Sequence, residues 1–136
     1  MEKVVLVPSD MSGKPITTSL TSTFFEPVKV VNLVDEIIIN YDSESAEMMF
    51  NKIQVRTERA IREYGDAKYY IICGGAVVNS VLVFDALLKC GVDRENIFLL
   101  VWEKSMHRYI VFNLKGERAG DEYDRPKPEE SEESGV

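Results

Sequence analysis

The stretch that decides the fold is residues 69–105, YYIICGGAVVNSVLVFDALLKCGVDRENIFLLVWEKS. A continuous apolar run ends at Cys73, two glycines follow, and residues 76–89 then repeat apolar side chains at spacings of three and four. Gly91 ends that segment, and a second continuous apolar run covers residues 97–102. Continuous apolar runs are typical of strands buried on both faces, whereas the middle spacing is typical of a helix. The stretch therefore predicts a strand, a glycine turn, a helix and a second, parallel strand.

The N-terminal half of the chain carries the remaining parallel strands and one long helix. Residues 3–7 (KVVLV) and 28–33 (VKVVNL) are β-branched apolar runs that predict two strands, the first of them central, and residues 36–41 predict a further one. Residues 16–26 fit a strand by their threonines and a helix by the spacing of their apolar side chains, and we favour the helix. Residues 42–64 place apolar side chains at helical spacing between charges, which predicts a long amphipathic helix.

The C-terminal apolar run completes the sheet. Only EKSM separates residues 97–102 from the run at residues 107–114, which is too short for a crossover helix, so the last strand should return antiparallel to its predecessor. Strands that alternate with helices and carry continuous apolar runs predict an α/β domain with a mainly parallel sheet. We therefore expect a three-layer, Rossmann-like fold with an antiparallel edge pair over residues 1–115, and a flexible acidic tail over residues 116–136.

The net charge of −7 on the 136 residues is concentrated in that tail, because residues 116–136 carry −5 and leave −2 for the rest. A nearly neutral body without a basic stripe disfavours extended nucleic acid as a partner. Residues 126–136 (PKPEESEESGV) have no large apolar side chain before the final valine, so they are expected to be solvated. Docking of this segment on a basic partner is the alternative.

The two cysteines favour reduced thiols over a metal site or a disulfide framework. Cys73 and Cys90 have neither CxxC spacing nor neighbouring histidines, so we expect no bound metal. Cys90 is expected to be a small buried residue, whereas Cys73 precedes the glycine pair and would lie near a bound ligand. No apolar run approaches the roughly 18 residues that a membrane span requires, and the N-terminus does not resemble a signal peptide. We expect a cytoplasmic protein that does not enter the membrane.

Three loops should meet at the carboxyl edge of the parallel sheet, where open α/β sheets bind their ligands. They have the sequences PSDMSGKP, CGGAVVN and EKSMH. A glycine pair lets the backbone approach a ligand closely, and the N-terminus of the following helix favours an anion, although the same glycines would also serve tight packing alone. The predicted ligand-binding residues are Ser9, Ser12, Lys14, Gly74, Gly75 and Asn79.

His107 is the only histidine and is the last residue of the third of these loops. It is the candidate for general acid or base catalysis, and a surface or structural role is its alternative.

Residues 69–101 resemble the phosphate-binding half of phosphoribosyltransferases of the uracil type, in which a strand runs into a Thr-Gly-Gly loop, a helix and a Gly-Val-x-x-Glu-Asn-Ile segment. The matching residues here are Cys73, Gly74 and Gly75, followed by Gly91, Val92, Glu95, Asn96 and Ile97. The segment GERAGDEY, residues 116–123, is similar to the base-binding loop of that family. By their layout, residues 68–114 also resemble small CRISPR-associated and viral Rossmann-like proteins that bind, and sometimes cleave, cyclic oligoadenylates. Both resemblances imply a phosphate-bearing ligand at the same edge of the sheet.

Two functions from different classes remain open. One is the binding of a nucleotide or another phosphate-bearing ligand at the carboxyl edge of the sheet, in a regulatory or ligand-degrading role. The other is a non-enzymatic interaction or structural protein, for example a viral one, that uses the fold as a partner surface. Residues 76–89 have more apolar surface than one sheet face can cover, so a symmetric homodimer is expected in either case.

Overall fold

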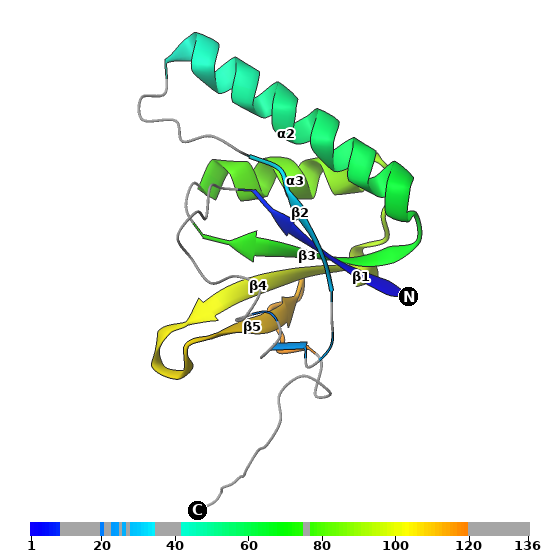
Figure 1. The fold of residues 1–136 in the computed structure, drawn as a ribbon, viewed down its shortest axis with the longest axis vertical. Helices are drawn as coiled ribbons and strands as arrows, with labels where there is room; N and C mark the ends of the chain where they lie inside the picture. Colours follow the sequence, from blue (N-terminus) through cyan, green and yellow to red (C-terminus); the bar gives the residue numbers. More distant parts are fainter. Residues whose placement is uncertain are drawn as a thin grey trace, which may run out of the picture.

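A computed structural model describes residues 1–8, 20, 23–24, 26, 28–34, 42–74 and 77–119 of the chain. In chain order the elements are β1 (Glu2–Val7), β2 (Lys29–Asn32), α2 (Ser43–Tyr64), β3 (Ala67–Cys73), α3 (Val77–Lys89), η1 (Arg94–Asn96), β4 (Ile97–Glu103), η2 (Lys104–Met106) and β5 (Arg108–Asn113). The strands form one sheet in the order β2-β1-β3-β4-β5, in which only the β4–β5 pair is antiparallel (Figure 1). The predicted α/β fold, with a mainly parallel sheet and an antiparallel edge pair, is confirmed.

Strand β1 is central, as its continuous apolar run predicts. It pairs in parallel with β2 on one side and with β3 on the other, and Val5 lies opposite both Val30 and Tyr70. Residues 4–7 are fully buried because side chains that alternate along the strand meet a covered face on either side.

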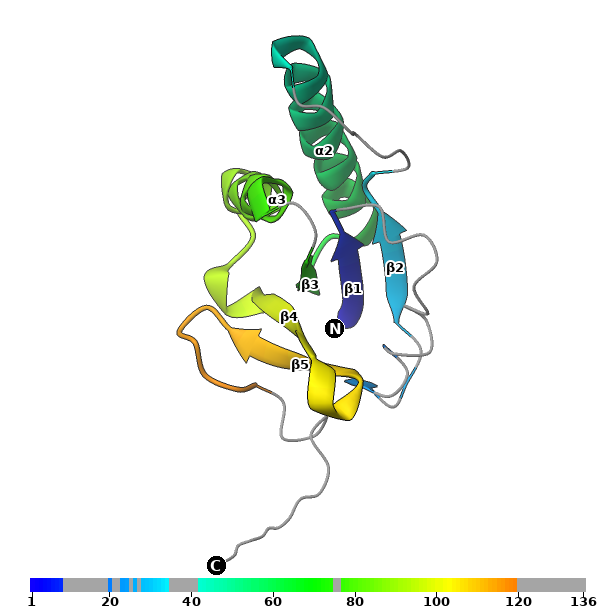
Figure 2. The same cartoon turned by 90° about the vertical axis from the view of Figure 1, so that its left-hand side faces the viewer.

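Helices α2 and α3 pack on the same face of the sheet (Figure 2). Asp42 accepts a hydrogen bond from the Ser45 backbone N–H at 2.8 Å and so caps α2, and Gly65 ends that helix at a positive φ of 61°. The inward side of α2 contributes Met49 and Ile53 to a core that also contains Leu87 of α3. This core fixes α2, which connects β2 to β3, and α3, which connects β3 to β4, against β1 and β3.

The opposite face of the sheet is covered by side chains from the connection between β1 and β2. Leu20, Thr23 and Phe24 are helical and buried, which agrees with the helix predicted for residues 16–26. The Phe24 ring meets Tyr70 edge to face at 4.9 Å, and the Thr23 hydroxyl donates to the Tyr109 carbonyl at 3.0 Å. The described residues therefore pack against the sheet from both sides.

Beyond β5 the chain turns back along the sheet edge. The Ala119 N–H donates to the Val111 carbonyl at 2.9 Å, and Phe112 pairs with Arg118 in an isolated antiparallel bridge. The strand predicted over residues 36–41 and the segment 120–136 of the predicted tail lie outside the described residues. Among the residues that are described, no helix is long and apolar enough to cross a membrane.

The expectation that Cys90 is buried is wrong. The cysteine is exposed, because α3 ends at Lys89 and Cys90 lies in the turn that leaves the helix before Gly91, whose φ is 84°. Helical spacing places Cys90 on the inward side of α3, but the helix no longer continues at that point.

Candidate ligand site at the carboxyl edge of the sheet

The topology creates a switch point between β1 and β3. The chain leaves β1 toward β2 on one side of the sheet, whereas it leaves β3 through α3 toward β4 on the other side. The first connection passes over the face that holds Leu20 and Phe24, and the second passes over the face that holds α3. In open α/β sheets, connections that diverge in this way leave a crevice at the carboxyl ends of the two strands, where ligands bind.

Asn79 joins the two strand ends at this switch point. It is the third residue of α3, is only 3% exposed, and donates a hydrogen bond from Nδ2 to the Pro8 carbonyl oxygen at 3.0 Å. Pro8 follows the last residue of β1, so this bond fastens the first turn of α3 to the end of β1. Two of the three loops that the sequence brings to this edge are therefore linked by one side chain.

The orientation of the Asn79 amide follows from its partner. A carbonyl oxygen can only accept, so the amide atom that faces Pro8 must be the nitrogen. The other amide atom, Oδ1, is then left buried, and among the described residues no donor lies within hydrogen-bonding distance of it. A buried acceptor without a partner costs about 1–3 kcal/mol, so the site is suited to a ligand that brings an N–H or O–H group.

Gly74, the first residue after β3, has open space beside its backbone. Gly74 is exposed, its φ is not positive, and a Cβ built on it would meet no described atom within 4 Å. Neither close packing nor a left-handed backbone therefore requires glycine at this position. The first turn of α3 contains no acidic side chain, so nothing in that turn opposes an anion at the positive end of the helix dipole.

Cys73 and Ser80 lie beside this turn, and both side chains donate hydrogen bonds to backbone carbonyls of β3. The Cys73 thiol lies 3.6 Å from the Ile71 carbonyl, to which it donates, and the Ser80 hydroxyl donates to the Ile72 carbonyl at 3.4 Å. Burial raises the pKa of the Cys73 thiol above its ordinary value, so the thiol is neutral near pH 7. Cys73 ends β3 beside Gly74, and its raised pKa means that it is not an activated nucleophile.

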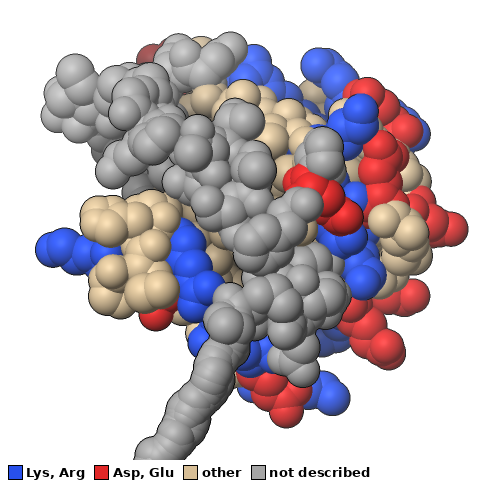
Figure 3. Space-filling view, turned by 60° about the horizontal axis from the view of Figure 1, so that its bottom comes forward, with Lys and Arg blue, Asp and Glu red and all other residues tan. Residues whose placement is uncertain are grey.

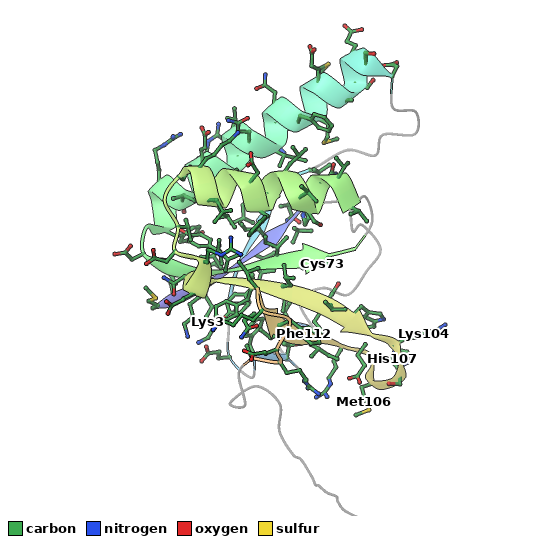
Figure 4. The ribbon with its side chains drawn as sticks, turned by 180° about the vertical axis from the view of Figure 1, so that it is seen from behind. Lys3, Cys73, Lys104, Met106, His107 and Phe112 are labelled. Carbon is green, nitrogen blue, oxygen red and sulfur yellow. The ribbon has the colours of Figure 1, made fainter. Side chains whose placement is uncertain are left out.

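His107 lies on the hairpin that joins β4 to β5, whereas the switch point lies between β1 and β3. Its side chain is exposed beside Lys104 and Met106, whereas Cys73 lies at the end of β3 under α3 (Figure 4). Its backbone is left-handed, with a φ of 51°, and its ring meets Trp102 edge to face at 6.2 Å. The structure does not bring the catalytic candidate and Asn79 together.

Of the predicted ligand-binding residues, Gly74 and Asn79 are described and share the switch point. The remaining four, Ser9, Ser12, Lys14 and Gly75, lie outside the described residues. Sequence reasoning missed the Pro8 carbonyl, because a backbone acceptor gives no signal in a residue pattern.

Three surface cavities are lined by described residues elsewhere on the chain. Their volumes are about 580, 330 and 310 Å³, and they lie along the first half of α2, beside the start of β1, and between β2 and α2. In the part of the chain that is described, no group of three or more histidine, cysteine, aspartate or glutamate side chains is placed to hold a metal ion.

Charges of both signs are mixed on the face that Figure 3 shows. Lys and Arg side chains stand beside Asp and Glu side chains there, and the described part of this face has no continuous basic strip. No protein-family model, curated protein or solved structure matches the chain. The function of the chain is therefore inferred from the geometry of the switch point.

Proposed function

We propose that the chain binds a nucleotide or another phosphate-bearing ligand at the switch point between β1 and β3. One observation carries this proposal, namely the buried Asn79 side chain, whose Nδ2 is used by Pro8 and whose Oδ1 has no partner among the described residues. The position of this unpaired acceptor in the first turn of a helix, at the edge where α/β sheets bind ligands, supports a recognition role.

The two halves of such a ligand would be recognised by different groups. An anionic phosphate suits the N-terminus of α3 and the open turn at Gly74, because first-turn N–H groups have no partner within the helix. A ribose hydroxyl or a base amino group would donate to Asn79 Oδ1. A ligand that carries both groups, such as a nucleotide or a cyclic oligoadenylate, fits this pair better than inorganic phosphate alone.

A specific observation also favours the rival function, an interaction protein without a ligand. Val77 and Val81 on α3 are 77% and 57% exposed, and Trp102 on the hairpin is also exposed. Exposed apolar side chains grouped on one element are typical of partner surfaces. An interaction protein would contact its partner through the outer side of α3, and Asn79 would then have no role in recognition.

Thermal unfolding in the presence of candidate ligands separates the two functions. Mononucleotides, cyclic oligonucleotides and sugar phosphates are each added to the full chain, with inorganic phosphate as the control. A ligand at a hundred times its dissociation constant adds about 2.7 kcal/mol to the free energy of unfolding, which appears as a clear rise in melting temperature. A rise with a nucleotide that exceeds the rise with inorganic phosphate supports the proposal, and no rise with any ligand favours the interaction protein.

A further inference from the structure

We propose that the outer side of α3 is the surface through which two copies of this chain associate, with their α3 helices antiparallel. The α3 stripe consists of Val77, Val81, Phe84 and Leu88. These residues follow one another at spacings of four, three and four, which is the spacing of the contact positions in packed helix pairs. The stripe lies opposite the inward side of α3, on which Asn79 and Val83 are buried.

The exposure of the stripe shows that the monomer leaves it uncovered. Val77 and Val81 are among the most exposed large apolar side chains of the described chain, and Phe84 and Leu88 are half-buried at the margin of the core. The described α-helices, α2 and α3, lie over β1, β3 and the start of β4 and do not extend over β5 (Figure 1, Figure 2). On the same face of the sheet as α3, Val101 is 38% exposed and Ile110 beside it is half-buried.

The size of this surface predicts a weak dimer. Helix α3 has 13 residues, so it offers a strip about 20 Å long and about 10 Å wide. Strands β4 and β5 add a patch about 20 Å by 10 Å, from six paired residues on two strands. The total, about 400 Å² in projection before the relief of the side chains is counted, lies below the roughly 600–800 Å² that each partner contributes to stable interfaces, as is typical of transient association.

The charges favour a second copy on this face over other faces. The whole chain carries −7, so two copies repel each other wherever acidic surface meets acidic surface. The α3 stripe itself carries no charge, and the two charged side chains of the helix, Asp85 and Lys89, neutralise each other in an ion pair of 2.9 Å. The other charge beside the stripe is the Arg94 guanidinium, which lies 5.9 Å from the centre of the Phe84 ring. Acidic surface therefore does not meet acidic surface when two α3 helices pack along their stripes.

The order of side-chain sizes along the stripe indicates the antiparallel direction. The N-terminal half of the stripe is small, with Val77 and Val81, and the C-terminal half is large, with Phe84 and Leu88. When the helices run antiparallel, Val77 meets Leu88 of the second copy and Val81 meets Phe84 of the second copy. Small side chains then face large ones along the whole contact, so the distance between the two helix axes stays constant along it.

Sedimentation velocity of the full chain between low and high micromolar concentration tests the surface. The wild-type chain should shift from monomer to dimer over this range. Val81→Glu should raise the dimer dissociation constant by at least about thirtyfold, the effect of losing one central contact residue. The matched control is Val55→Glu, because Val55 is a 44% exposed valine on the outer side of α2, and this change should leave the dissociation constant unchanged.

Disulfide trapping tests the direction. Val77→Cys and Leu88→Cys are each made together with Cys90→Ser, and equimolar mixtures are oxidised. The antiparallel dimer gives mainly the mixed disulfide between the two variants. Circular dichroism checks that each variant is folded, and Val81→Ser replaces Val81→Glu if the latter is not. A wild-type chain that stays monomeric throughout, equal weakening by Val55→Glu, or disulfides mainly between identical variants would overturn the proposal.

Discussion

Replacing Asn79 by leucine distinguishes a ligand-binding asparagine from a structural one. Leucine has a similar size, so it fills the space of the amide without opening a cavity, but it offers neither a donor to the Pro8 carbonyl nor an acceptor to a ligand. Asn79 is 3% exposed, so both effects are felt in a buried environment. The fold should therefore tolerate leucine at this position, whereas ligand binding should not.

The expected change in stability is small because two terms oppose each other. Loss of the 3.0 Å hydrogen bond leaves the Pro8 carbonyl without that donor, which costs about 1–3 kcal/mol. Removal of the unpaired Oδ1 relieves a penalty of the same size, about 1–3 kcal/mol, and leucine adds apolar burial. The free energy of unfolding should therefore change by less than about 1 kcal/mol, whereas the ligand, whose donor loses its acceptor, should bind about tenfold to a hundredfold more weakly.

Urea unfolding of the free chain and titration with the best nucleotide from the thermal screen measure the two quantities. Ser80→Ala is the matched control, because Ser80 lies in the same turn and its hydroxyl reaches the Ile72 carbonyl only at 3.4 Å. This variant should change neither quantity appreciably. Destabilisation by Asn79→Leu of more than about 3 kcal/mol, or undiminished binding, would show that Asn79 is a structural residue.

Three further predictions concern the turn, the hairpin and the thiols. Gly74→Ala adds a methyl group in open space, so urea unfolding should show a gain of about 0.4–1 kcal/mol while nucleotide binding weakens; a loss of stability would contradict the open turn. His107→Gly relieves a left-handed backbone and should gain about 0.5–1 kcal/mol in the same assay; a loss of stability would show that the contact of His107 with Trp102 outweighs the strain. Iodoacetamide at pH 7.5, followed by mass spectrometry, should modify exposed Cys90 well before Cys73, because burial raises the pKa of the Cys73 thiol; equal rates would refute this.

The arrangement of the elements was predictable because it depends on periodicity and on loop length. Continuous apolar runs identified β1, β3 and β4 as strands between two neighbours, and the four residues before His107 ruled out a crossover helix. The position of Gly74 and Asn79 at one sheet edge follows from the same reasoning, since parallel strands bring their carboxyl ends together. The pattern of residue types was therefore sufficient to predict the type and order of these elements.

The local environment of single residues was less predictable. The spacing of α3 suggested a buried Cys90, but burial also depends on where the helix ends, and the turn at Gly91 exposes the thiol. The partner of Asn79 is a backbone carbonyl, so its identity depends on how close α3 comes to the end of β1. Distances between elements of this kind are set by packing, which a single sequence does not display.

The proposed ligand site uses the inward side of α3 and the proposed dimer uses its outer side, so the two proposals can fail independently. Asn79 points to the inside of the fold and Val81 to the outside, because two residues along a helix are about half a turn apart. Val81→Glu should therefore abolish the dimer and leave nucleotide binding to the monomer, whereas Asn79→Leu should weaken binding and leave the dimer intact. If Val81→Glu also weakens binding in equilibrium titrations, the two sites are coupled, and by reciprocity saturating nucleotide must then strengthen the dimer by the square of that factor, because the dimer holds two sites. A dimer dissociation constant that does not respond to saturating nucleotide would exclude that coupling and assign each side of the helix its own function.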